Sequence, residues 1–255
     1  LFHSGGNDDP LPLAANAGNA FQGSIVLGMG FTFDDTDKKG VASSLGDMHR
    51  LVAREPRNAE RIFPFLGYEE VANSPQHSNH RFVIGFDDMP LSRGADGSWM
   101  TAPEVQRKEW LRTGNVPYDY PGPVAEDWPD LVSVVRSRVK PEREKSVANP
   151  MAKRRAIYWW KYGSPAKDLY AAIANQEFVL VNASQAASQF AFAQVSSRSV
   201  FSSNLNVFAQ FRDDLFGILQ CRVHEAWSRF FGSTIEDRLA YTLTDCFATY
   251  PFPGQ

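Results

Sequence analysis

Residues 179–209 read VLVNASQAASQFAFAQVSSRSVFSSNLNVFA, and their pattern decides the fold class. Val, Phe and Leu recur at close intervals and Ser or Asn clusters interrupt them, which is typical of short β-strands joined by turns. We expect three strands, at 178–184, 189–195 and 200–210. Thirteen of the thirty-one residues are Ser, Asn or Gln, and Arg198 carries the only charge. Any surface function of this ribbon therefore relies on neutral hydrogen-bonding side chains.

Helical patterns lie on both sides of the ribbon. Ser164 and Pro165 are a good helix start, and that helix is expected to run to about Gln176. Asp213 or Asp214 can cap a final long helix. Its expected apolar face consists of Leu215, Leu219, Val223, Ala226, Trp227 and Phe230. The aromatic tail that follows is expected to pack back on the domain.

Earlier segments complete the expected architecture. The patterns at 21–33 and 81–89 indicate strands, and 41–54 indicates a helix. Another helix starts at Trp128, and Pro141 ends or kinks it. The sequence therefore predicts an α+β fold, with a mixed or antiparallel β-sheet core, flanking helices and a long C-terminal helix. Residues 1–20 are interpreted as a linker, 21–253 as one domain, and 88–127 as a surface excursion with one short helix near 104–111.

Composition limits the class of protein. The 255 residues are 43% hydrophobic and carry a formal net charge of −3, so bulk charge does not indicate a nucleic-acid partner. No apolar run approaches the roughly 18 residues that a membrane span needs. Two cysteines are too few for a disulfide framework, so we expect reduced thiols and a cytoplasmic location. The polar start has no signal-peptide pattern and no Met, which indicates a fragment of a longer protein.

The net charge hides a local asymmetry. Residues 131–170 contain ten Lys or Arg and three acids, which leaves the other residues with −10. The aromatic run at 158–162 lies within this basic segment. A phosphate backbone suits such a surface, because Lys and Arg neutralise phosphates. A solvated helix face with a buried Trp pair is the alternative, and composition alone favours that alternative.

Patterns for catalysis and metal binding are absent. Residues 28–31 lack the spacing and the Lys of a phosphate loop, and no nucleophile elbow occurs. His77 and His80 have no nearby acids or thiols that would complete a metal site. Asn149-Pro150 continues as Met-Ala, and so it does not match the Asn/Asp-Pro-Pro-aromatic loop of amino-methyltransferases. We expect a chain that is not an enzyme by itself and that holds neither metal nor cofactor.

Several long segments, in order, resemble one family. They are GSIVLGMGF (23–31), IFPFLGYEEVANSPQHSNHRFVIGF (62–86), WPDLVSVVRSRVKPER (128–143), YWWKYG (158–163) and RVHEAWSRFFGS…YTLTDCFATYPFP (222–253). Together they resemble the C-terminal target recognition domain of MmeI-like enzymes, which are type IIL fused restriction–modification proteins and related N6-adenine DNA methyltransferases. The resemblance covers nearly the whole chain. The segment at about 88–127 is longer than the family pattern.

The resemblance implies that this chain recognises double-stranded DNA beside a methyltransferase domain of the same polypeptide. S-adenosylmethionine binding, the catalytic loop and any Mg²⁺-dependent nuclease would then lie upstream. A member without a nuclease would look the same here. The competing interpretation is a protein-interaction module that docks a methyltransferase or another subunit and reads no bases.

Base reading in the major groove uses Asn and Gln for adenine, Arg for guanine, and Ser for either. Under the resemblance, the candidate base-reading residues are Asn182, Ser184, Gln185, Ser188, Gln189, Gln194, Ser196, Ser197, Arg198 and Ser199. Candidate phosphate contacts are Arg136, Arg138, Lys140, Arg143, Lys153, Arg154, Arg155 and Lys161. Four residues before a strand could contact DNA or brace their loop, with bracing slightly favoured: His77, Asn79, His80 and Arg81. His224 is interpreted as a buried histidine rather than a catalytic base.

Overall fold

The computed structural model describes residues 10–145, 148–184, 189–235 and 238–253, and they form an α+β fold. They divide into two compact units. Unit 1 takes its residues from Leu1–Ser24, Leu66–Asn79 and Ala166–Gln255, and unit 2 from Ile25–Phe65 and His80–Pro165. In this described part, no helix has both the length and the apolar character needed to cross a bilayer.

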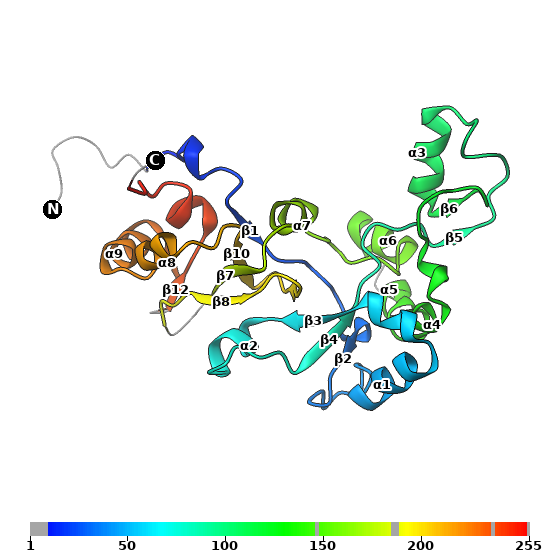
Figure 1. Ribbon diagram of the computed structural model, residues 1–255, viewed down its shortest axis with the longest axis horizontal. Coiled ribbons are helices and arrows are strands. Elements are labelled where there is room, and N and C mark those ends of the chain that lie inside the picture. Colours follow the sequence, from blue (N-terminus) through cyan, green and yellow to red (C-terminus); the bar gives the residue numbers. More distant parts are fainter. Residues whose placement is uncertain (1–9, 146–147, 185–188, 236–237, 254–255) are drawn as a thin grey trace. The chain divides into compact units, whose positions relative to one another are not determined.

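Unit 1 is built on an antiparallel sheet with the strand order β1-β10-β7-β8 (Figure 1). The bounds are Ala20–Gln22 for β1, Phe178–Ala183 for β7, Ala193–Ser196 for β8 and Leu205–Phe208 for β10. The first expected strand of the ribbon is confirmed almost residue for residue. The second starts later than expected, and the third is split, because a turn separates β9, Val200–Phe201, from β10.

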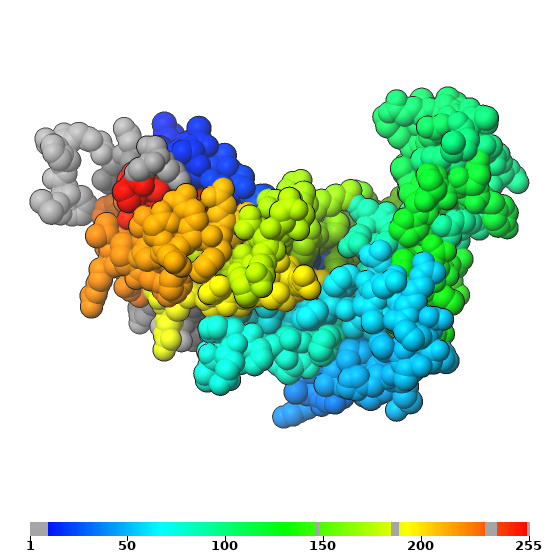
Figure 2. Space-filling view, viewed as in Figure 1, coloured from blue at the N-terminus to red at the C-terminus, as the bar shows by residue number. Residues whose placement is uncertain are grey.

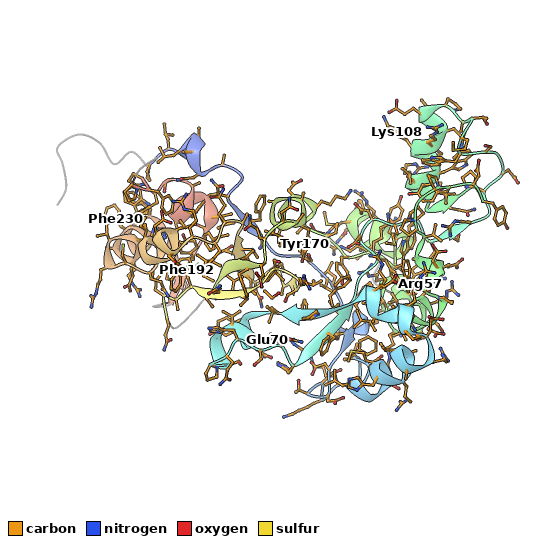
Figure 3. All side chains as sticks on the ribbon, in the orientation of Figure 1. Arg57, Glu70, Lys108, Tyr170, Phe192 and Phe230 are labelled. Carbon is orange, nitrogen blue, oxygen red and sulfur yellow. The ribbon has the colours of Figure 1, made fainter. Side chains whose placement is uncertain are left out.

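Alternate side chains of β7 pack on the two faces of this sheet, as a pleated strand requires. Val179 and Val181 join a cluster that also holds Leu169 and Ile173 of α7, Lys167–Ile173. Leu180 faces a second cluster, in which aromatic residues dominate; Figure 3 labels one of them, Phe192. Helix α2, Tyr68–Asn73, packs near β7. The strand is therefore buried on both sides.

The prediction of one long C-terminal helix is wrong, because two shorter helices stand in its place. They are α8, Asp213–Leu219, and α9, Arg222–Phe231. The break at Gln220 has a tertiary cause: its amide Nε2 donates to the Phe192 carbonyl at 3.1 Å, and its Oε1 accepts from the Phe192 N–H at 3.3 Å. The expected apolar face also changes, because α9 buries His224 and leaves Phe230 exposed (Figure 3).

The C-terminal tail packs on unit 1, as expected. A short hairpin of β11, Ser233–Ile235, and β12, Arg238–Ala240, leads to a π-helical turn at Leu243–Phe247. Tyr241, Phe247, Tyr250 and Phe252 all enter the aromatic cluster. The side chain of Asn16 fixes this end, since its Nδ2 lies 2.9 to 3.1 Å from three carbonyl oxygens, those of Phe247, Ala248 and Tyr250. The 3₁₀ turn Ala14–Asn16 carries that residue.

Unit 2 contains three antiparallel strands in the order β2-β4-β3. Their bounds are Thr32–Phe33, Arg81–Ile84 and Ile62–Leu66. The helices are α1, Leu45–Arg54, α4, Pro129–Arg138, α5, Lys140–Lys145, and α6, Pro150–Ile157. Three 3₁₀ turns connect them: Met29–Phe31, Pro56–Arg61 and Ala125–Asp127. The helix is interrupted at Val139, between α4 and α5, and Pro141 is the second residue of α5, so the helical region continues past it.

Trp128 stands at the start of α4 and organises unit 2. Its ring is 2% exposed, and its Nε1 donates to the carbonyl of Arg57 at 3.0 Å. The guanidinium groups of Arg57 and Arg61 lie 4.6 and 4.7 Å from the ring centroid. Two cations stacked on this ring and one hydrogen bond hold the start of α4 in place. This placement sets the direction of the basic helices that follow.

The excursion at 88–127 has a small structure of its own within unit 2. It holds β5, Ser92–Arg93, α3, Glu104–Thr113, and β6, Asn115–Val116, so the short expected helix is confirmed. β5 and β6 pair in parallel. A separate cluster of Trp110, Val116 and Val124 supports it. Figures 1 and 2 show this segment standing out from the rest of unit 2.

Candidate nucleic-acid interface

The candidate phosphate contacts come from three consecutive helices of unit 2 and one aromatic loop. Helix α5 contacts both α4 and α6, so α4, α5 and α6 form one helical group. The loop at 158–162 follows α6 directly (Figure 1). Residues 145–167 contain six Lys or Arg and no acid. This group is therefore the most cationic segment of the chain.

Arg143 is a structural residue, and its expected phosphate contact is corrected. Its side chain points inward from α5 and only 8% of the residue is exposed. Five carbonyl oxygens accept from its guanidinium at 2.7 to 3.3 Å, namely those of Val26, Leu27, Tyr158, Trp159 and Lys161. Burial, with a smaller effect of the Arg155 charge, lowers its pKa to about 10. Arg143 thus ties the 158–161 loop to the 26–27 loop.

Three further cations are partly committed to the protein. Arg138 donates from Nη1 to the carbonyls of Gly40 and Val41 at 3.2 and 3.0 Å. Arg136 pairs with Glu126 at 3.0 Å, and Lys140 with Glu144 at 3.8 Å. Arg136 and Lys140 also cover the ring of Trp159, at 5.6 and 5.8 Å from its centroid. A carboxylate already compensates the charges of Arg136 and Lys140, so a bound polyanion would gain less from these two residues.

Helix α6 carries the cations that the protein compensates least: Lys153, Arg154 and Arg155. Among the residues that the structure describes, none of these three forms an ion pair with a carboxylate. Arg154 lies 6.0 Å from the ring centroid of Tyr158, and Nη2 of Arg155 lies 3.2 Å from Sδ of Met151. These contacts orient the guanidinium groups without neutralising them.

Lys161 extends the same cationic surface. Its Nζ donates to the carbonyl of Asp88 at 3.0 Å and lies 5.6 Å from the Trp160 ring centroid. Burial, together with the positive charge of Arg154, lowers the pKa of Lys161. A bound anion would offset this mutual repulsion between the two cations.

The aromatic loop itself is a scaffold. Trp159 and Trp160 are buried, and Nε1 of Trp160 donates to the Met89 carbonyl at 3.0 Å. The hydroxyls of Tyr158 and Tyr162 donate to the carbonyls of Arg112 and Ile84 at 2.7 and 2.8 Å. The Trp pair is thus a buried anchor beside the basic helices, and its rings are not free to stack on bases.

In unit 1, two of the expected base-reading residues lie inside the fold, and their expected role is corrected. Asn182 is 3% exposed, and its Oδ1 accepts from Asn206 Nδ2 at 3.0 Å. Asn206 also donates to the Tyr241 carbonyl at 2.9 Å. Ser199 is buried as well. The Asn pair replaces apolar packing at the centre of the sheet, where both amides need partners.

The exposed members of the set lie on the β8 edge and the turn after it. Gln194 and Ser196 alternate with buried Val195, as expected for a strand with one buried face. Ser197 is anchored, since its N–H donates to the Glu177 carbonyl at 3.0 Å and its Oγ to the Gln176 carbonyl at 2.5 Å. Gln189 is exposed and Ser184 half-buried. Gln185 and Ser188 lie outside the described residues.

Arg198 projects from this anchored turn. Its N–H donates to Ser196 Oγ at 3.3 Å, and its side chain is exposed. Among the described residues it has no carboxylate partner. It borders a groove of about 610 Å³ that Tyr170, Ile173, Asn175, Glu177 and Ser197 also line. Figure 3 labels Tyr170, which comes from α7.

The histidine loop and His224 have packing roles. Nδ1 of His77 lies 2.9 Å from the Val71 carbonyl, which braces the turn in which His77 adopts a φ of +49°. Arg81 stacks over Phe65 at 5.2 Å, Asn79 is half-buried and His80 is exposed. Nε2 of His224 lies 2.9 Å from the Tyr241 hydroxyl inside the aromatic cluster. Among the described residues, no three His, Cys, Asp or Glu gather as they would around a metal ion.

No family model and no curated protein matches this sequence. The fold is similar to a solved structure described as type IIL restriction-modification enzyme MmeI in complex with DNA. The TM-score is 0.59 at 14% sequence identity, over 98% of this chain. The match covers 27% of that protein, so this chain spans about a quarter of its length. The likeness establishes a related fold.

Proposed function

We propose that this chain is a double-stranded DNA recognition domain of an N6-adenine DNA methyltransferase or fused restriction–modification enzyme. The observation that carries the proposal is the cationic surface of unit 2 formed by Lys153, Arg154, Arg155 and Lys161, which all lie in a sequence segment without acids. Uncompensated cations on a fixed helix suit a phosphate backbone. Of the candidate phosphate contacts, these four remain in the proposed set, with Arg136 and Lys140 at its border.

Two further observations support this function. The fold is related to that of MmeI, a protein that was solved with DNA. The exposed polar edge of β8 and its turn, with Gln194, Ser196 and Arg198, offers donors and acceptors for base edges. We assign base reading to this edge and phosphate contact to the helical surface. S-adenosylmethionine, the methyltransferase domain and any Mg²⁺ belong to other parts of a longer polypeptide in this proposal.

The alternative is a protein-interaction module, and one observation favours it. Helix α9 exposes Val223 and Phe230, at 68% and 71%, and buries His224. Figure 3 labels Phe230. Exposed apolar side chains on a helix are typical of docking faces. Only the first function uses the cationic surface of α6, and a binding experiment therefore separates the two.

The test is the affinity of the chain for duplex DNA as a function of salt. Arg154→Ala should weaken binding to all sequences and reduce the slope of log K against log salt by about one. Lys108→Ala is the matched control, because Lys108 is exposed on α3 but already pairs with Glu104 at 2.5 Å. If Arg154→Ala changes neither affinity nor slope while the control behaves like the wild type, the cationic surface does not bind DNA.

A further inference from the structure

Helix α6 is almost entirely exposed. Its outward side consists of Pro150, Met151, Lys153, Arg154 and Ile157. Positions 150, 153, 154 and 157 follow the i, i+3, i+4, i+7 spacing of a single helix face. Only Ala152, Arg155 and Ala156 are half-buried, and no residue of the helix is fully buried. Met151 and Ile157 are each 63% exposed.

A short helix without a buried face is marginal in water, so other contacts must hold α6 in place. The Asn149 side chain caps its first turn, since Oδ1 accepts from the Ala152 N–H at 2.9 Å, and Pro150 occupies the first helical position. At the other end, Arg143 fixes the carbonyls of Tyr158 and Trp159. The scaffold thus holds α6 at both ends and leaves its outward face free.

Charge and size indicate what this face contacts. Lys153 and Arg154 flank Ile157 within a segment that has no acid, so the partner is a polyanion. A helix with its side chains is about 10–12 Å across, which fits the width of about 12 Å of the DNA major groove. Contact with phosphates alone does not account for the exposed apolar side chain of Ile157 on this face. Contact with thymine methyl groups in the major groove does account for it, because these methyl groups are the apolar part of a base edge.

We propose that the outward face of α6 enters the major groove of duplex DNA, with Ile157 against a thymine methyl group and Lys153 and Arg154 at the flanking phosphates. This inference rests on the proposed function and extends it. It makes α6 a second base-reading element, separate from the β8 edge. It also explains why Arg143 ties down the loop next to α6, since a helix in a groove needs a fixed position.

The experiment selects binding sites from duplexes with a randomised central segment, using the full 255-residue chain. The wild type should enrich a motif with T·A pairs. Replacing the contacted thymine by uracil in the selected duplex removes one methyl group and should lower affinity by about fourfold. Ile157→Ala should bind the selected duplex more weakly with an unchanged salt slope, and should no longer distinguish thymine from uracil.

Val105→Ala is the control, because Val105 is an apolar residue of α3 that is 81% exposed. It should respond to uracil like the wild type. If Ile157→Ala also responds like the wild type, the groove contact is wrong and the proposed function survives. If the wild type binds DNA without enriching a motif, the chain reads no bases, and both the groove contact and the recognition function are wrong. In the first case the apolar face serves a protein partner. If the wild type does not bind duplex DNA at all, the proposed function fails and this inference fails with it.

Discussion

His224 shows how one buried residue makes stability depend on pH. Burial among aromatic rings lowers its pKa from the usual 6.5 to about 4. Between these two values the unfolded chain binds a proton that the folded chain does not, so the free energy of unfolding falls as pH falls through that window. The full effect is about 3 kcal/mol, and it fades about one pH unit above 6.5, where the histidine is neutral in both states.

Urea unfolding at pH 7, 6 and 5 should therefore show a loss of up to about 1.4 kcal/mol per pH unit below pH 6.5. His224→Gln is the comparison variant, because glutamine can hydrogen-bond the Tyr241 hydroxyl and does not titrate. The slope of its unfolding free energy against pH should be smaller by about one proton, which corresponds to about 1.4 kcal/mol per pH unit. Equal pH dependence in the two proteins would mean that His224 is accessible to protons in the folded state.

At the scale of elements, the sequence predicts structure where the determinants are local. The continuous apolar run of β7 and the run of helix-forming residues of α3 between Pro103 and Gly114 are visible in a few consecutive residues, and both elements form as expected. The break between α8 and α9 depends on Gln220 meeting Phe192, which lies 28 residues earlier. Arg143 is buried because it meets a loop 117 residues away. Such long-range partners leave no local pattern, so an inward arginine looks like a surface cation.

The same reasoning applies to the polar ribbon. Its many Ser, Asn and Gln residues predict a surface for base reading, but the sequence does not show which of these side chains are buried in the sheet. Gln194 and Ser196 face solvent because β8 is an edge strand, whereas Asn182 lies on a strand with neighbours on both sides. Strand order therefore decides which half of the candidate set remains available.

The buried Asn pair gives a prediction for the sheet. Asn206 links β10, β7 and the tail segment, because its amide donates to both Asn182 Oδ1 and the Tyr241 carbonyl. Asn206→Ala leaves two buried acceptors without their donor and should lower the free energy of unfolding by about 2 kcal/mol. Asn204→Ala, on the exposed turn before β10, should change it by less than about 0.5 kcal/mol. Similar urea midpoints for both variants would show that the Asn pair adds nothing to the sheet.

At the scale of the whole molecule, charge is divided unevenly along the chain. The net charge of −3 combines +7 in residues 131–170 with −10 elsewhere. The basic helices belong to unit 2 and the polar ribbon to unit 1. Under the proposed function, one unit supplies most of the salt-dependent affinity and the other supplies sequence preference. The two contributions can then be changed separately.

Arg198 and Arg154 test this division, because they belong to different units. Arg198→Ala should change the preferred base at one position of the selected motif, with a cost of about 1–3 kcal/mol on the original sequence. Arg154→Ala should lower affinity for every sequence alike. Because separate contacts contribute independently, the losses in the double variant should add to within about 0.5 kcal/mol. An unchanged motif with Arg198→Ala would remove this residue from the reading set. A double variant no weaker than Arg154→Ala alone would show that the two arginines do not act as separate contacts.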